Sequence, residues 1–94
     1  MGGDLRIQER FHDKLKRLIH EYVLLTYTLT KKYPNEERYG LISQDRRASL
    51  SIMLNYVEGY GRMKDGVKKN FYEISFASLK ESIYCKYIAL NQNI

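Results

Sequence analysis

The stretch NYVEGYGR, residues 55–62, contains the residues of this sequence that most resemble a chemical site. A carboxylate, Glu58, follows the amide of Asn55 by three residues and precedes Gly59 and Gly61. A general acid needs an oriented partner, and a phosphate-binding glycine loop needs a preceding strand, whereas the residues before Glu58 have helical periodicity. We therefore interpret the glycines as a helix end and a turn. We expect Asn55 and Glu58 to join a buried hydrogen-bond network with serines of the following helix.

The remaining residues that could perform chemistry are two histidines and one cysteine. His12 and His20 are separated by eight residues, which places them about 80° apart around a helix, and no cysteine or carboxylate stands at ligand spacing from them. Cys85 has no companion histidine in a recognisable motif, so we interpret it as a core residue. We expect no catalytic residue, no metal, no cofactor and no enzymatic activity. A hydrolase that uses Glu58 would lack a nucleophile and a base.

Basic side chains are concentrated in two parts of the chain. Residues 1–17 and 55–72 together carry nine Lys or Arg against five Asp or Glu, a net charge of +4 out of +5 for the whole chain. In the first part they recur at helical spacing beside an apolar seam. A surface of this kind binds phosphates with steep salt dependence and little sequence preference; the alternative is a solvated charged face. The candidate nucleic-acid-binding residues are Arg6, Arg10, Lys14, Arg17, Arg62, Lys64, Lys68 and Lys69.

Apolar periodicity predicts an all-α protein in which three long helices position these residues, at about 5–33, 40–59 and 66–90. Pro34 ends the first helix, because the residue before a proline is pushed out of the helical region. The third helix carries a stripe of bulky residues beside a stripe of small ones. We therefore expect it to be packed on more than one side and to lie at the centre of an antiparallel up-down bundle. The apolar seam of the first helix is Phe11, Leu15, Leu18, Tyr22, Leu25 and Leu29, and Ile19 and Val23 widen it. The small-residue stripe of the third helix is Ser75, Ser78, Ser82, Cys85 and Ala89.

Length and composition indicate one domain, residues 1–94. The 94 residues are 44% apolar, and the single cysteine cannot form an internal disulfide. A domain of this size buries a modest fraction of its surface, so a partner subunit would stabilise it. No apolar run of membrane-spanning length and no signal pattern is present, which predicts a cytoplasmic protein without a membrane partner.

Two segments carry a resemblance to a known family. EERYGLISQDRRASLSIMLNYVEGYGR, followed by FYEISFASLKES, resembles the four-helix-bundle protein family encoded in intervening sequences of bacterial 23S ribosomal RNA genes. The family motifs are an E-R-x-G-L turn, a Q-x-R-R-A-x-x-S-I helix that ends N-I-A-E-G-x-G-R, and a later G-S-L-x-E. The residues that we assign to the structural motif are Arg46, Arg47, Ser51, Asn55, Glu58, Gly59, Gly61, Ser78 and Glu81.

The chain also departs from the family pattern. Met53 stands where the family has proline, Asp45 and Lys68 stand where it has apolar residues, and the sequence ends where the connection to a fourth helix would start. The fourth family helix is therefore absent or truncated here, which leaves an apolar groove to be covered and favours self-association.

The resemblance implies a non-enzymatic bundle that forms homopentameric rings. It also implies a relationship to an accessory protein of diversity-generating retroelements that binds a reverse transcriptase and its RNA. We therefore predict an oligomeric accessory protein that binds nucleic acid, preferably RNA. The alternative is a structural module that recruits another protein, such as a reverse transcriptase, without binding nucleic acid. Because neighbouring helix positions point about 100° apart, we expect one of Arg46 and Arg47 to form a salt bridge, with Glu81 as a candidate partner, and the other to face solvent.

Overall fold

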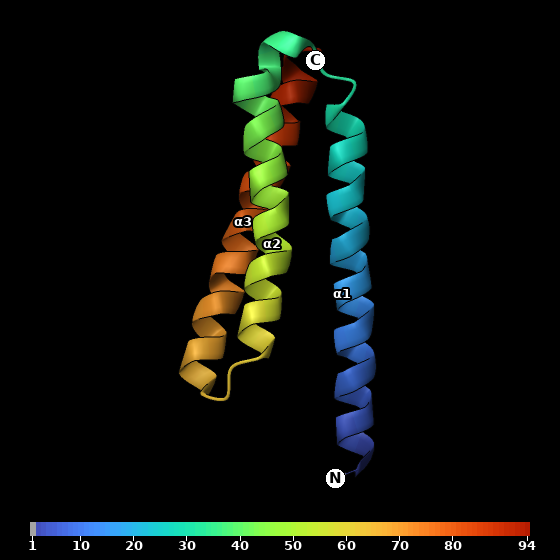
Figure 1. Cartoon of the computed structure of the whole chain (residues 1–94), viewed down its shortest axis with the longest axis vertical. Coiled ribbons are helices and arrows are strands. Elements are labelled where there is room, and N and C mark those ends of the chain that lie inside the picture. Colours follow the sequence, from blue (N-terminus) through green and yellow to red (C-terminus); the bar gives the residue numbers. More distant parts are fainter. Residues whose placement is uncertain (1) are drawn as a thin grey trace.

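The computed structural model describes the backbone of residues 2–94 and the side chains of residues 10–94. The chain forms three long helices, α1 (Gly2–Thr30), α2 (Ser43–Tyr60) and α3 (Asp65–Asn91). Figure 1 shows the three helices side by side along the length of an elongated molecule, which measures 53 × 22 × 17 Å. Residues 2–94 contain no strand. The prediction of an all-α protein with three long helices is confirmed.

The connection between α1 and α2 is more elaborate than predicted. α1 ends at Thr30 rather than at about Tyr33, because the chain tightens into a turn before Pro34. A short 3₁₀ helix, η1 (Asn35–Glu37), and a π-helical turn, η2 (Arg38–Ile42), then lead into α2. Gly40 has non-helical backbone angles, φ −109° and ψ −110°. α2 therefore begins at Ser43, later than the predicted start near residue 40.

The two glycines do mark a helix end and a turn, as predicted, but Gly61 rather than Gly59 caps the helix. α2 continues to Tyr60, and none of the described glycines has a positive φ. Gly59 is buried, and a Cβ atom at this position would lie 2.9 Å from Cβ of Phe71 and 2.8 Å from Cε1 of Tyr72. Gly59 is thus required because α3 approaches the backbone of α2 closely. The last helical turn is capped at Gly61, whose φ is −78°.

The small-residue stripe of α3 is the face that packs on α2. The α3 residues Ser75, Ser78 and Ser82 are buried, as are Cys85 and Ala89. The hydroxyl of Ser75 donates to the carbonyl of Ile52 at 2.7 Å, and Ser78 shares a hydrogen bond of 2.8 Å with Ser51. Small side chains with their hydroxyls satisfied allow the two helices to pack closely. α2 contacts both other helices, so α2 rather than α3 is central.

α1 packs on the core through only part of its predicted apolar stripe: Ile19 is buried, and Leu15, Tyr22 and Val23 pack against it. Near the start of α1, His12 contacts Tyr56 of α2, and at its end Thr30 contacts Arg46. Ile19 lies between them and packs with Ile52 and Tyr56 in the apolar core. Most of the predicted seam is instead exposed: Phe11, Leu18, Leu25 and Leu29.

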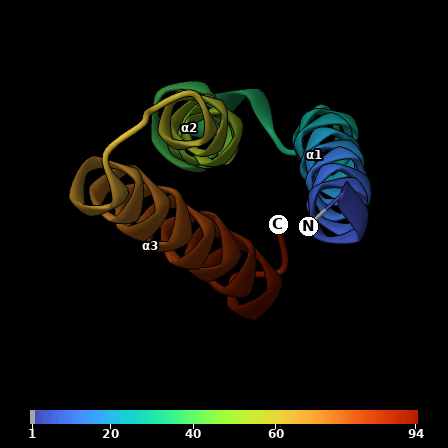
Figure 2. The same ribbon diagram turned by 90° about the horizontal axis from the view of Figure 1, so that it is seen from below.

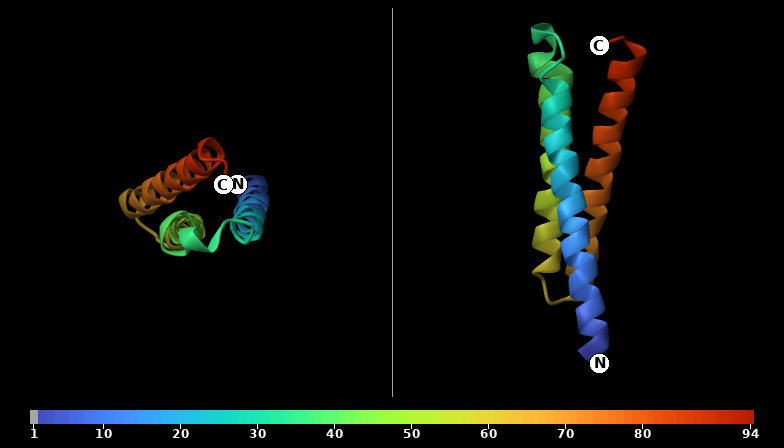
Figure 3. Two further views of the ribbon diagram at one scale, coloured as in Figure 1. Left: turned by 90° about the horizontal axis from the view of Figure 1, so that it is seen from above. Right: turned by 90° about the vertical axis from the view of Figure 1, so that its right-hand side faces the viewer.

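Two exposed aromatic residues, Phe11 of α1 and Phe76 of α3, line the same cavity between the helices. Viewed along the molecule, α2 lies on one side of α1 and α3, and the opposite side is left open (Figure 2). Figure 3 shows that the first turns of α1 extend beyond the loop that joins α2 to α3. Within the described residues, no helix combines the length and apolar character needed to cross a membrane.

Candidate nucleic-acid interface

The predicted basic residues of α1 lie on its outer face. Arg10, Lys14 and Arg17 are exposed, and the side chain of Arg6 lies outside the described residues. Arg10 precedes His12, and Arg17 precedes Ile19, by two positions, which corresponds to about 160° around the helix. These arginines therefore point away from α2, where they are free to meet a large anionic partner.

The basic residues of the α2–α3 loop are partly neutralised by carboxylates. Arg62 forms a salt bridge with Glu58, and its guanidinium lies 5.3 Å from the centre of the Phe71 ring. Lys69 lies 3.9 Å from a carboxylate oxygen of Glu73, whereas Lys64 is exposed. The prediction that Glu58 joins a buried network is wrong. Glu58 points about 60° away from Asn55 around the helix, and its side chain is 50% exposed.

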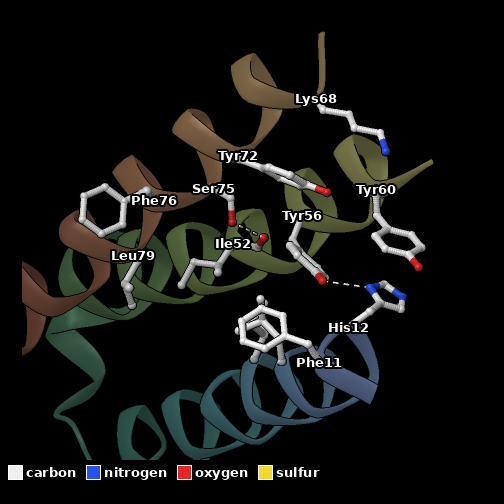
Figure 4. A pocket seen from close by; sticks show the side chains of 12 residues that line it. Phe11, His12, Ile52, Tyr56, Tyr60, Lys68, Tyr72, Ser75, Phe76 and Leu79 are labelled. Carbon is white, nitrogen blue, oxygen red and sulfur yellow. Dashed lines mark hydrogen bonds between the residues drawn. The ribbon is translucent and has the colours of Figure 1, made fainter. Parts of the chain in front are cut away.

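Lys68 lies at the mouth of an apolar cavity between the three helices (Figure 4). The cavity has a volume of about 640 Å³. Its mouth carries a cluster of aromatic rings: His12 stacks on Tyr60 with ring centres 3.5 Å apart, and Tyr56 lies 5.6 Å from Tyr72. The Nζ atom of Lys68 is 6.0 Å from the centre of the Tyr60 ring. Aromatic faces beside a lysine can stack on an unpaired base while the ammonium group contacts its phosphate.

Two tyrosines of this cluster, Tyr56 and Tyr72, remain neutral at physiological pH. Burial raises the pKa of Tyr56, and neighbouring tyrosines add to the shift. Burial also raises the pKa of Tyr72. Tyr56 and His12 are joined by a hydrogen bond of 2.8 Å between Oη and Nδ1. The sequence contained a signal for this cluster, because Tyr56 and Tyr60 stand one helical turn apart, but His12 was assessed only as a metal ligand.

A buried polar cluster joining the three helices was not predicted. The Asp45 carboxylate is fully buried, and both of its oxygens lie 2.9 Å from Nζ of Lys86. Ser82 donates to Asp45, and the Lys86 ammonium also donates to Thr26 at 2.9 Å and to Tyr22 at 3.1 Å. Asp45 had been noted only as a departure from the apolar residue of the family. The cluster binds α1 to both other helices, so its role is structural.

The remaining motif residues form internal contacts. Arg46 packs against α1, where it donates to Thr30 and lies 4.8 Å from the centre of the Tyr27 ring. Arg47 is exposed and donates to Ser43. Arg47 faces solvent, as predicted for one of the two arginines, but Arg46 contacts α1 through a hydrogen bond and an aromatic ring instead of a salt bridge. Glu81 is exposed, and among the side chains of residues 10–94 it pairs with neither arginine.

The amide of Asn55 donates to the backbone and hydroxyl oxygens of Ser51, both at 2.9 Å. Ser51 in turn bonds Ser78 of α3. The predicted link from Asn55 to a serine of the third helix therefore exists, with Ser51 as the bridge and without Glu58.

The described residues contain no cluster of three or more histidine, cysteine and carboxylate side chains that could hold a metal ion. Cys85 is buried against α2, and burial raises the pKa of its thiol. A protonated, enclosed thiol is a poor nucleophile, which agrees with its interpretation as a core residue.

The comparison with known families agrees with the motifs. The family described as 23S rRNA-intervening sequence protein matches residues 14–94. No curated protein matches the chain. The match extends from the first half of α1 through the end of α3 and includes each turn and helix that carries a motif residue. The chain belongs to the 23S rRNA-intervening sequence protein family.

Proposed function

We propose that the protein is a non-enzymatic, oligomeric accessory protein that binds nucleic acid, preferably RNA, through its basic end. The observation that carries this proposal is the exposed row of Arg10, Lys14 and Arg17 on the outer face of α1, where no α2 or α3 contact competes for the charges. Lys64 and Lys68 supply further cations at the same end of the molecule. Backbone phosphates are the partner that such a surface fits best.

The proposal includes self-association, in which the three helices form an antiparallel up-down unit and a second copy covers the open side. Phe11, Leu18 and Leu25 recur every seven residues along α1 and are 66%, 47% and 66% exposed. Phe76, Ile83 and Leu90 recur every seven residues along α3 and are 60%, 52% and 75% exposed. Heptad spacing on both sides of an open groove suits a neighbouring helix packed at a shallow angle. A ring of copies, as in the pentamer implied by the resemblance, would repeat the basic end and increase avidity.

The open groove also supports a second function, a protein-protein module without nucleic-acid binding. A groove with apolar residues at heptad spacing accepts an amphipathic helix of another protein as readily as a second copy. The two functions differ in which surface is used: the outer cations of α1 for nucleic acid, and the apolar groove for protein.

Fluorescence anisotropy with a labelled structured RNA, a single-stranded RNA and a DNA duplex tests the proposal. The variant Arg10→Glu/Arg17→Glu removes two cations from the outer face of α1, and Lys32→Glu/Arg47→Glu makes the same charge change at the other end. We expect the native protein to bind RNA at about 50 mM salt and to lose most affinity by about 200 mM. The first variant should bind weakly, and the slope of log affinity against log salt concentration should be smaller by about two.

The control variant should keep most of the affinity, and light scattering should give the same mass for all three proteins. Absence of RNA binding by the native protein at the lower salt concentration would contradict the proposal and leave the protein-protein module. Equal losses in both variants would show that net charge rather than the α1 surface determines binding.

A further inference from the structure

A polar hollow of about 330 Å³ lies at the opposite end of the molecule from the proposed RNA surface. It is enclosed by the end of α1, the connection containing η1 and η2, and the start of α2. Three cations from these three segments line it: Lys31, Arg38 and Arg46. Asn35 and Ser43 line it as well and add neutral hydrogen-bonding groups. Positive charges and neutral hydrogen-bond donors therefore surround one small volume.

Arg46 is held in place before any ligand arrives. Its Nε donates to Thr30 Oγ1 at 2.8 Å, and its guanidinium lies over the Tyr27 ring. Thr30 is fully buried and is itself fixed, because its hydroxyl donates to the Thr26 carbonyl at 2.7 Å. A guanidinium that is already oriented loses little entropy when it binds an anion. Arg46 can thus form the rigid floor of a binding site while Lys31 and Arg38 close over it.

The charges of the hollow are not neutralised by the described side chains. Among residues 10–94, no carboxylate forms a salt bridge with Lys31, Arg38 or Arg46. Asp45, the neighbour of Arg46 in sequence, is bound to Lys86 and does not line the hollow. Tyr33 also lines the hollow, and burial raises its pKa, so its hydroxyl stays a neutral donor. An anion entering here would meet unpaired cations and donors.

We propose that this hollow, formed by Lys31, Arg38 and Arg46, is a binding site for a phosphate group. Two or three cations with a forked guanidinium match the oxygens of a phosphate better than those of a single carboxylate. The phosphate is either the terminal phosphate of a polynucleotide or inorganic phosphate in solution. The site uses none of the residues of the basic end, so it can be tested independently of the proposed RNA surface.

An NMR titration with inorganic phosphate at constant ionic strength tests the site. We expect saturable shifts of the Arg46 Nε–H and of the backbone amides of Asn35 and Arg38. In Lys31→Gln/Arg38→Gln the apparent dissociation constant should rise about tenfold or more, as expected for the loss of charge-assisted hydrogen bonds. The control Lys32→Gln/Arg47→Gln removes two neighbouring cations that do not line the hollow and should leave the titration unchanged.

Shifts that stay linear with phosphate concentration, or that spread over lysines of the whole surface, would overturn the proposal. An equal weakening in both double variants would overturn it as well, because local charge alone would then explain binding. A short RNA with and without a 5′ phosphate separates the two sources. A preference for the phosphorylated RNA that is lost in Lys31→Gln/Arg38→Gln identifies a terminal phosphate; equal binding of both RNAs, with the inorganic phosphate titration intact, identifies free phosphate.

Discussion

The contact between α2 and α3 and the contact of α1 with that pair are built from different chemistry. α2 and α3 meet through small residues, and Gly59 allows the backbone of one helix to touch side chains of the other. α1 is attached through the core residue Ile19 and through hydrogen bonds that the Lys86 ammonium donates to Tyr22 and Thr26. The contact of α2 with α3 thus combines close approach of small residues with the ion pair of Asp45 and Lys86. The contact of α1 has no such close approach and depends on polar groups, chief among them the Lys86 ammonium that Asp45 holds in place.

This difference explains where the proposed binding surfaces lie. Because α2 and α3 are in close contact along a stripe of small residues, little of that interface is left to a partner. α1 leaves most of its apolar seam and all of its described basic stripe exposed. The cavity beneath Lys68 and the hollow beside Arg46 are each lined in part by α1. A binding protein can thus be made by attaching one helix loosely to a tightly packed pair.

The largest expected effect comes from removing the lysine that pairs with Asp45 of α2 and also donates hydrogen bonds to α1. Lys86→Met leaves the buried Asp45 carboxylate without its cation and should lower the free energy of unfolding by about 3 kcal/mol. This value is near the low end of the loss expected when a buried ion pair is broken, because the Lys86 side chain is still 24% exposed. Urea unfolding followed by circular dichroism at one protein concentration measures this. Lys80→Met, which removes an exposed lysine from the same helix, should change the stability by less than about 0.5 kcal/mol.

Adding Asp45→Asn to Lys86→Met should restore much of the loss, because no charge is then buried. If Lys86→Met were as stable as Lys80→Met, the polar cluster would not be what holds α1, and the contrast between the two contacts would have to be abandoned.

A smaller effect is expected from a methyl group in the close contact of α2 with α3. Gly59→Ala places a Cβ atom 2.9 Å from Cβ of Phe71, so the helices must separate, which should cost about 1–3 kcal/mol. Gly66→Ala is the matched control, because a Cβ atom there meets nothing within 4 Å. The control should gain up to about 1 kcal/mol from the lower entropy of the unfolded chain. Thermal unfolding of both variants measures whether each substitution raises or lowers the stability. A Gly59→Ala variant more stable than the native protein would contradict the proposal that the close approach of α2 and α3 limits the side chain at this position.

Much of the fold could be predicted from the sequence. Helical periodicity located the three helices to within a few residues, and the small residues of α3 correctly indicated a closely packed face. The prediction for α1 was right in part: Ile19 and its neighbours in the stripe meet the core, whereas the outer part of the seam is exposed. The regular spacing of Phe11, Leu18 and Leu25 marks an apolar face but does not say what covers it. The face that packs on α2 includes Thr26 and Thr30, and their polarity hides them from a search for apolar stripes.

The polar sites were harder to predict because their partners are distant in sequence. From the sequence alone Asp45 is expected at the surface, because its partner Lys86 lies 41 positions later and is brought beside it only by the packing of α3. The spacing of Asn55 and Glu58 suggests that they are partners. The two positions nevertheless differ by about 60° around the helix, and Glu58 faces solvent and pairs with Arg62. The hollow beside Arg46 depends on η1 and η2, whose irregular backbone has no periodicity to reveal it.

The smallest expected effect concerns Tyr56, where the two contacts meet. Burial raises its pKa above the ordinary value of 10.0, so the folded protein favours the neutral phenol. The stabilisation is complete below the pKa of the unfolded chain and is lost as the pH rises through the higher pKa of the folded state.

Tyr56→Phe should therefore lower stability at neutral pH by about 1 kcal/mol, through loss of the hydrogen bond to His12, and flatten the alkaline decline. Urea unfolding from about pH 8 to 11 measures both changes. Tyr39→Phe, at a side chain 91% exposed, should change neither. An unaltered alkaline decline in Tyr56→Phe would show that the Tyr56 phenol does not contribute to this decline and would contradict the prediction.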